Sequence, residues 1–310
     1  MRVKTRLRRW WMAVPYRLRF RIGAARRTAL LLVHRRRFNK LLRNNPAAPA
    51  PPPVEPVWPL PRRAGGPSEQ EIRDRFAPPS LWHYDYKFEG GLEFESRHVR
   101  PTPYLRHDHA LNKFRHIMPW LLQATGGSLS GKRVLDIGCS SGFWPIQCAL
   151  FGAREVVGID ARPDVIGQAN FVRSIVGVEN VQFRALDFWD MTPEALGGKF
   201  DAVLALSFLF HLADPLAALE RIRRIARGHI VLDSILSRNE DSVLRLFWEK
   251  ADDINLGATP GMVAWPSKSA MEMMFRHLGL SRYKEIPPRS VRTDPSILTG
   301  ERCVWLIDVS

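Results

Sequence analysis

The chain has 310 residues, of which 45% are hydrophobic, and this is enough for one large folded domain with further segments. No stretch approaches the about 18 consecutive apolar residues of a membrane span. The three cysteines, Cys139, Cys148 and Cys303, fit neither a disulfide framework nor a metal-site spacing. We therefore expect a protein of a reducing compartment, the cytoplasm, without a bound metal.

The net charge of +15 comes from the first 43 residues, which hold 15 Lys and Arg but no Asp or Glu. Because the whole chain has 46 basic and 31 acidic residues, the remainder is electrically balanced. Aromatic residues such as Trp10, Trp11 and Phe20 lie among these arginines. A basic amphipathic arm of this kind predicts binding to anionic lipid, at the inner membrane surface, or to RNA. A solvated tail without a partner is the alternative.

Residues 44–67 are rich in proline and predict a stiff, extended linker after the arm. Residues 68–130 are predicted to form an N-terminal lid or helical extension. It begins with a short helix after Ser68, passes through the aromatic stretch Leu81–Phe88 and ends with an amphipathic helix at about His107–Ala124. The histidines of this region match no metal-ligand spacing; they are His98, His107, His109 and His116.

Residues 131–310 alternate strands and helices, which indicates an α/β domain with a largely parallel sheet. Seven strands are predicted: one ending at Asp136, then Glu155–Ile159, Val181–Ala185, Asp201–Leu206, His229–Leu232, Arg282–Ile286 and Cys303–Asp308. The predicted helices are one ending at about Leu150, then Pro163–Val176, Pro215–Ala226, about 240–255 and about 267–278.

The turn after the first strand carries the pattern Asp136-x-Gly138-x-Ser140-x-Gly142. Glycines let the backbone turn sharply and approach a ligand closely, and the following helix offers free N–H groups at its N-terminus. A dinucleotide fingerprint needs glycines at positions one, three and six of such a turn, and this turn lacks two of them. We therefore expect these residues, together with Cys139, to bind a different nucleotide-type ligand.

Polar residues also follow the next two strands, at the sheet edge where open α/β folds bind ligands. Asp160 ends the second strand, where a carboxylate can accept hydrogen bonds from both ribose hydroxyls. Asp187 follows the third strand and suits an adenine amino group, and Phe188 could stack on the ring. Asp136 would orient the turn or interact with an ammonium group through water. Each acid taken alone could instead be a helix cap or turn former.

The turn pattern resembles motif I of the class I S-adenosylmethionine (SAM) methyltransferases, with Ser140 in place of the middle glycine. The positions of Asp136, Asp160 and Asp187 match the residues that bind the cofactor in that family. The resemblance implies a Rossmann-like, seven-stranded methyltransferase sheet with helices on both faces, and S-adenosyl-L-methionine as the cofactor.

Residues 200–222, 230–236 and 264–280 resemble pieces of the methyltransferases that form 5-oxyacetate or 5-methoxyuridine at the tRNA wobble position, and of their uncharacterised relatives. In the carboxymethyl-transferring members a tyrosine stands where this chain has Phe210. Their arginines after the following histidine correspond here to Leu212 and Ala213. A carboxylated SAM would lose hydrogen-bond partners, so we expect plain SAM.

His211 lies just after the fourth strand and is the candidate catalytic base if the acceptor is a hydroxyl. The alternative is a histidine that holds its loop through a backbone hydrogen bond. Residues 265–267 are expected to form a loop over the acceptor pocket. Asp214 and Asp233 are interpreted as helix caps or turn formers.

The sequence thus predicts a SAM-dependent methyltransferase that modifies a hydroxyl of a small molecule, lipid or glycan. One alternative is an RNA methyltransferase whose arm contacts phosphates while a flipped base enters the pocket. A SAM-binding module without catalysis is another. The lack of excess positive charge after residue 43 argues against RNA. The acceptor and the oligomeric state are left open.

Overall fold

The protein is described from a computed structural model. The structure describes residues 50–78, 80–96, 109–250, 258, 261–288, 295–298 and 300–310. The predicted basic arm and two of the histidines considered above, His98 and His107, lie outside these ranges. Within the described ranges, no helix combines the length and the apolar character needed to cross a bilayer.

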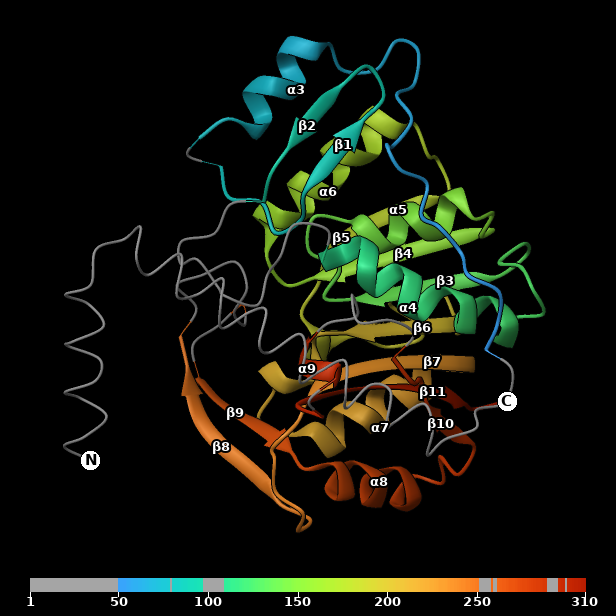
Figure 1. Cartoon of the computed structure of the whole chain (residues 1–310), viewed down its shortest axis with the longest axis vertical. Helices are drawn as coiled ribbons and strands as arrows, with labels where there is room; N and C mark the ends of the chain where they lie inside the picture. The colour runs from blue at the N-terminus through green and yellow to red at the C-terminus, as the bar shows by residue number, and fades with distance from the viewer. Residues whose placement is uncertain are drawn as a thin grey trace, which may run out of the picture.

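A seven-stranded sheet forms the centre of the domain, with the strand order β10-β11-β7-β6-β3-β4-β5 (Figure 1). Five strands are parallel: β3 (Arg133–Ile137), β4 (Glu155–Asp160), β5 (Val181–Ala185), β6 (Phe200–Leu206) and β7 (Ala226–Ile235). Strand β11 (Arg302–Asp308) pairs antiparallel with β7, and β10 (Tyr283–Glu285) pairs antiparallel with β11, so β10 again runs in the direction of the five parallel strands. The predicted seven-stranded α/β sheet is confirmed. The strand order reverses between β3 and β6, which is where such sheets bind ligands.

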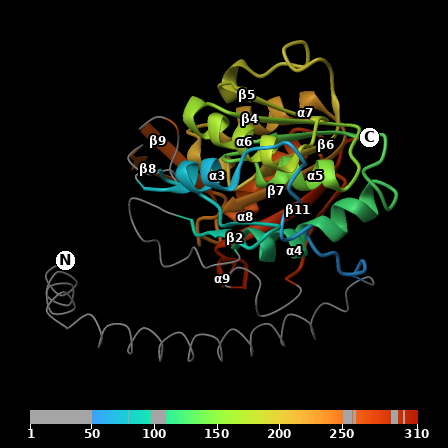
Figure 2. The same ribbon diagram turned by 90° about the horizontal axis from the view of Figure 1, so that it is seen from above.

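The sheet is buried on both faces because successive strand residues enter two different hydrophobic clusters. Val134 packs with the first cluster, and its neighbour Leu135 packs with the second. Helices therefore cover both faces, as Figures 1 and 2 show. The first face carries α4 (His109–Ala124), α5 (Phe143–Leu150) and α6 (Pro163–Val176), and the second carries α7 (Pro215–Ile225) and α8 (Lys268–His277).

The predicted helix at about 240–255 is wrong over its central part. Residues Leu244–Glu249 form strand β8, which pairs with β9 (Gly261–Pro266) in a separate two-stranded antiparallel ribbon. The sequence of β8 alternates between two faces, with Leu244 on one face and Arg245 on the other, and this period of two suits a strand. Trp265 therefore belongs to a strand and not to a loop.

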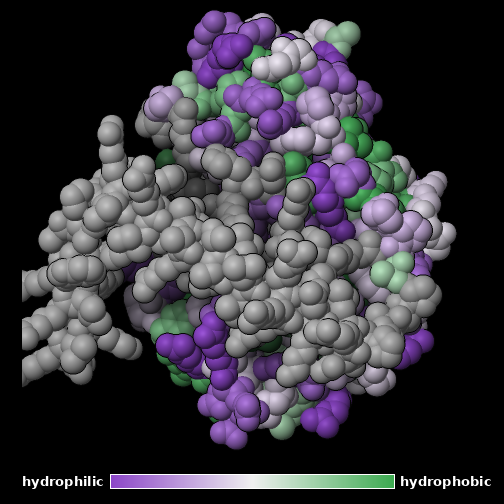
Figure 3. All heavy atoms as spheres, in the orientation of Figure 1, coloured by the Kyte–Doolittle hydropathy of each residue, from purple (hydrophilic) through white to green (hydrophobic). Residues whose placement is uncertain are grey.

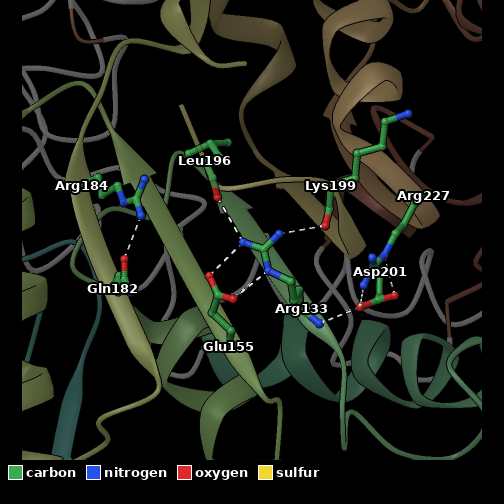
Figure 4. Close-up of polar contacts among 8 residues, drawn as sticks. All are labelled: Arg133, Glu155, Gln182, Arg184, Leu196, Lys199, Asp201 and Arg227. Carbon is green, nitrogen blue, oxygen red and sulfur yellow. Dashed lines mark hydrogen bonds and ion pairs between the residues drawn. The ribbon is translucent and has the colours of Figure 1, made fainter. Parts of the chain in front are cut away.

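A polar network joins the amino ends of the strands, opposite the edge that carries the predicted site (Figure 4). The buried guanidinium of Arg133 binds both carboxylate oxygens of Glu155, with N···O distances of 2.7 and 2.9 Å. It also donates to the carbonyl oxygens of Leu196 and Lys199, and its backbone N–H donates to Asp201. These bonds tie β3 to β4 and to the start of β6.

The described part of the proline-rich segment packs on the domain, in contrast to the extended linker that its composition predicted. Val57 exchanges two hydrogen bonds with the Gln147 side chain on α5, both 3.0 Å long. Leu60 is buried and bonds through its backbone to Lys87 and Glu89. Burial of the Leu60 side chain and the hydrogen bonds of its backbone hold this segment on the domain, although its prolines favour an extended chain.

The segment between residues 68 and 96 forms a small aromatic layer against the first cluster. Helix α3 (Glu69–Phe76) has the predicted start, with Ser68 and Glu71 forming a capping box. Phe76 at its end stacks on Trp82, with ring centroids 3.9 Å apart. Two short strands follow, β1 (Tyr86–Phe88) and β2 (Leu92–Phe94).

Candidate active site

A cavity of about 640 Å³ opens at the carboxyl ends of the parallel strands. Five elements contribute to its walls: the turn after β3, the ends of β4, β5 and β6, and helix α4. The ribbon β8–β9 and the start of β11 also contribute to the walls. The site therefore lies at the sheet edge that the sequence predicted.

The glycine turn after β3 needs its small residues for steric reasons. Gly138 and Gly142 have φ values of 71° and 88°, in the left-handed region that favours glycine. A Cβ on Gly142 would lie 2.6 Å from the Phe183 ring, and one on Gly138 would lie 3.1 Å from the Phe208 ring. Ser140 also has a positive φ, 48°, and its buried Oγ has no hydrogen-bond partner among the residues that the structure describes. Gly138 and Ser140 line the cavity, and Cys139 and Gly142 support the turn from behind.

Asp160 is buried and faces the cavity from the end of β4. One oxygen accepts the backbone N–H of Ser140 at 3.1 Å, so the carboxylate fixes the glycine turn. Both oxygens also bind the Arg162 side chain, at 2.9 Å each. With the Arg162 backbone N–H, each oxygen accepts two hydrogen bonds, which is the full capacity of a carboxylate.

Asp136 lies behind the turn and does not line the cavity. Burial, and then repulsion from Asp160, hold the pKa of Asp136 well above its usual range. Nearby, the buried hydroxyl of Tyr86 donates to the Ser141 carbonyl oxygen at 2.6 Å. This bond clamps the turn from the aromatic layer, and the sequence analysis did not predict it. Tyr84 from the same layer lines the cavity.

Asp187 and Phe188 lie together at the rim, beyond the end of β5. The Asp187 carboxylate accepts the backbone N–H of Trp189 at 2.8 Å and thereby caps the short helix η1 (Phe188–Asp190). The Phe188 ring is buried against Phe208, with ring centroids 4.9 Å apart. Both residues line the cavity, and an aromatic face is thus available there.

His211 ends the short helix η2 (Leu209–His211) and lies on the other side of the cavity. Its Nδ1 is 2.7 Å from a carboxylate oxygen of Glu249, the last residue of β8. The two side chains are only 15% and 10% exposed, and both line the cavity. Glu249 was not among the predicted site residues, because residues 240–255 were expected to be helical and Glu249 in fact ends strand β8.

A second group of charges forms the floor of the cavity. Asp233, fully buried inside β7, binds Lys113 of α4 and Arg302 of β11, each through the same oxygen at 2.7 Å. Ser207 bonds to all three side chains. Burial alone would raise the pKa of Asp233, but the charges of Arg302 and Lys113 hold it well below its usual range. Asp233 is therefore not the turn former that was expected, whereas Asp214 does cap helix α7.

The structure thus brings most of the predicted site residues to one cavity. Gly138, Ser140, Asp160, Asp187, Phe188 and His211 line it, and Asp136, Cys139 and Gly142 lie behind it. We call the charged group around Asp233 the floor cluster; its other members are Lys113, Ser207 and Arg302. The sequence predicted neither this cluster nor the role of Glu249, because the residues that meet there are far apart in the sequence. No group of three or more His, Cys, Asp or Glu suited to a metal occurs in the part of the chain described here.

This sheet order, with a glycine turn after the first parallel strand and acids after the next two, defines a class I SAM-dependent methyltransferase fold. Residues 128–268 match a family model described as a methyltransferase domain. The solved N-terminal domain of EvdMO1, determined in the presence of SAH and D-fucose, is 19% identical. It superposes with a TM-score of 0.60 over 79% of this chain and 98% of that chain, and this likeness shows the fold.

Two curated groups are similar over part of the chain. A ubiquinone biosynthesis O-methyltransferase of Bordetella parapertussis is 36% identical over 137 residues, which cover 44% of this chain and 54% of that protein. A tRNA U34 carboxymethyltransferase of Campylobacter hominis is 26% identical over 192 residues, covering 55% and 63%. The chain thus matches little more than half the length of these relatives. Residues 128–268 therefore form a methyltransferase domain of the class I, SAM-dependent kind, for which S-adenosyl-L-methionine is the cofactor.

The residues of the cavity fit this cofactor. The buried Ser140 Oγ lacks a partner within the described part of the chain, and Gly138 leaves room for a close approach. Asp160 and Asp187 present carboxylates to the cavity, and these can accept hydroxyl and amino donors of a nucleoside once the Arg162 side chain leaves Asp160. Phe188 adds an aromatic surface. The two carboxylates and the aromatic surface therefore suit the adenosine portion of the cofactor.

Proposed function

We propose that this protein is an O-methyltransferase in which His211, oriented by Glu249, removes the proton from a hydroxyl of the acceptor. The proposal rests mainly on the 2.7 Å contact between His211 Nδ1 and the Glu249 carboxylate at the cavity wall. We further propose that Gly138, Ser140, Asp160, Asp187 and Phe188 hold SAM, supported by Asp136, Cys139 and Gly142.

The His–Glu pair can do this work because each partner fixes a different property of the ring. Glu249 accepts a hydrogen bond from the Nδ1–H group, so Nε2 of His211 carries the lone pair and can accept a proton. When the ring gains that proton, the nearby carboxylate stabilises the positive charge. SAM, when bound, supplies an electrophilic methyl group, and a deprotonated oxygen is the better nucleophile for it.

A hydroxyl of a small molecule, lipid or glycan is the acceptor class that this pair suits. A neutral amine acceptor, which already has a free lone pair, has less need of a base. The similarity to a ubiquinone biosynthesis O-methyltransferase, at 36% identity, supports an oxygen acceptor. The similarity to a tRNA U34 carboxymethyltransferase keeps RNA as the alternative substrate.

The test is a transfer assay with methyl-labelled SAM, a panel of phenols, catechols and sugars, and tRNA. With any hydroxyl acceptor found, we expect His211→Gln to lower kcat by about 10²- to 10⁴-fold, the usual contribution of a general base. Glu249→Gln should lower kcat by about tenfold or more, because the ring loses its fixed tautomer. Both variants should bind S-adenosylhomocysteine as the wild type does.

Glu179→Gln, on the exposed surface before β5, is the matched control and should leave kcat unchanged. If His211→Gln loses stability and cofactor affinity but keeps kcat, His211 only holds its loop and the proposal is wrong. Transfer to tRNA and to none of the small hydroxyl acceptors would favour the RNA alternative. Cofactor binding without transfer to any acceptor would favour the non-catalytic module.

A further inference from the structure

One face of the ribbon β8–β9 exposes large apolar side chains to solvent. Leu244, Leu246 and Trp248 alternate along β8 and are 46%, 54% and 71% exposed. Met262 on β9 pairs with Trp248 and is 49% exposed. We call these four side chains the ribbon face. In Figure 3 hydrophobic atoms, in green, reach the surface at the lower left, where Figure 1 shows the ribbon.

The opposite face of the ribbon belongs to the cavity. Arg245, Glu249 and Trp265 line it, and Phe247 packs edge-on against Trp265 with ring centroids 4.5 Å apart. The ribbon is held to the domain through β9, whose Ala264 N–H donates to the Leu212 carbonyl oxygen at 2.9 Å. The ribbon face therefore lies directly behind a wall of the cavity.

The exposure of these apolar side chains is notable because β8 is an edge strand. Within the described residues the ribbon has two strands, and β8 pairs with β9 alone. Edge strands of soluble proteins are usually protected by charged residues, and a row of exposed Leu and Trp on one is unusual. A concentrated apolar surface of this kind marks a site of interaction.

We infer that the ribbon face inserts into the surface of an anionic lipid bilayer. Leu and Trp side chains suit the boundary between head groups and acyl chains. The exposed, basic Lys250 follows the Trp248 end, where Glu249 faces the cavity and binds His211. The acidic residues Glu240 and Asp241 lie before the other end of the strand. Residues 1–43 add 15 basic side chains and no acidic one. An apolar anchor with a basic segment is the pair of signals that stable membrane attachment needs.

This attachment would place the cavity beside the bilayer, and an acceptor with an apolar portion could then reach it from the membrane. That consequence rests on the proposed methyltransferase function, whereas the attachment itself does not. Lipid binding is measured without methyl transfer, so the two proposals can fail independently.

The experiment is flotation of the full chain with vesicles of phosphatidylcholine, alone or mixed with phosphatidylglycerol. We expect binding to the mixed vesicles, weakened about 10- to 100-fold in the double variant Leu246→Ser/Trp248→Ser, because the apolar area available for insertion is lost. Met273→Ser is the matched control, since Met273 is 52% exposed but lies on α8, outside the ribbon face. It should bind as the wild type does. Because all three side chains are exposed, we expect unchanged melting temperatures.

Deletion of residues 1–43 separates the two contributions and should weaken binding further when combined with the double variant. Three results would overturn the inference. The full chain could fail to bind mixed vesicles, or the double variant could bind them as tightly as the wild type. Alternatively, the double variant could change the oligomeric state on gel filtration and not the lipid affinity, in which case the ribbon face binds a second copy of the chain.

Discussion

Asp160 offers the sharpest test of the cofactor site, through the isosteric substitution Asp160→Asn. Its two oxygens already accept four hydrogen bonds, two of them from the Arg162 side chain. Ribose hydroxyls that bind there must replace the Arg162 side chain, so binding exchanges hydrogen bonds and does not simply add them. Each charge-assisted bond contributes about 1.5–3 kcal/mol, and the exchange leaves a net loss of about 1–2 kcal/mol in the variant.

This loss corresponds to about a 5- to 30-fold higher Kd for S-adenosylhomocysteine, measured by calorimetric titration. Asp164→Asn, on the exposed first turn of α6, is the control and should bind as the wild type does. Denaturant unfolding of both variants checks that the glycine turn, which Asp160 also holds, is intact. If Asp160→Asn is folded and binds the ligand with wild-type affinity, Asp160 does not bind the ribose.

Three further changes probe what holds the site in place. Tyr86→Phe removes the 2.6 Å bond to Ser141 and should lower the free energy of unfolding by about 1–2 kcal/mol, measured with denaturant, and weaken S-adenosylhomocysteine binding. Arg133→Ala leaves Glu155 and two carbonyl oxygens without their partner, and should cost about 2–4 kcal/mol in the same assay. The depressed pKa of Asp233 means that its ionised form stabilises the fold above pH about 4, and that this contribution disappears as the pH falls toward the folded-state value. Asp233→Asn should therefore be less stable at neutral pH but lose less stability between pH about 4 and about 2, and an unchanged pH dependence would contradict this.

The cofactor half of the site could be predicted because its residues depend on local sequence. Asp136 ends the apolar run of β3 just before the Gly138 turn, Asp160 is the last residue of β4, and Asp187 follows β5 by two residues. Since parallel strands present their carboxyl ends at one sheet edge, knowledge of the strands was enough to bring these side chains together.

The acceptor half could not be predicted in the same way, because its contacts join distant segments. His211 was identified by its place after β6, but its partner Glu249 depended on β8, which was expected to be helical. Lys113 and Arg302 meet at Asp233 from opposite ends of the domain, and no spacing in the sequence signals that meeting. The alternation in Leu244–Glu249 was the one available signal, and it was overlooked.

The floor cluster makes a prediction about additivity, because two cations share one buried carboxylate. Lys113→Met leaves Arg302 to neutralise Asp233, and Arg302→Met leaves Lys113, so each single variant should lose only about 1–2 kcal/mol of unfolding free energy. The double variant leaves a buried, uncompensated charge and should lose more than the sum of the two.

Adding Asp233→Asn to the double variant tests the cause directly. If the excess loss comes from the unpaired charge, the triple variant should recover a large part of it, because a neutral amide is far less costly to bury than a carboxylate. Additive losses, or no recovery in the triple variant, would mean that Lys113 and Arg302 stabilise the domain by packing α4 and β11 against β7 and not by neutralising Asp233. The position of the cluster, where the elements before and after residues 128–268 meet, implies that the methyltransferase domain depends on both for its cavity floor.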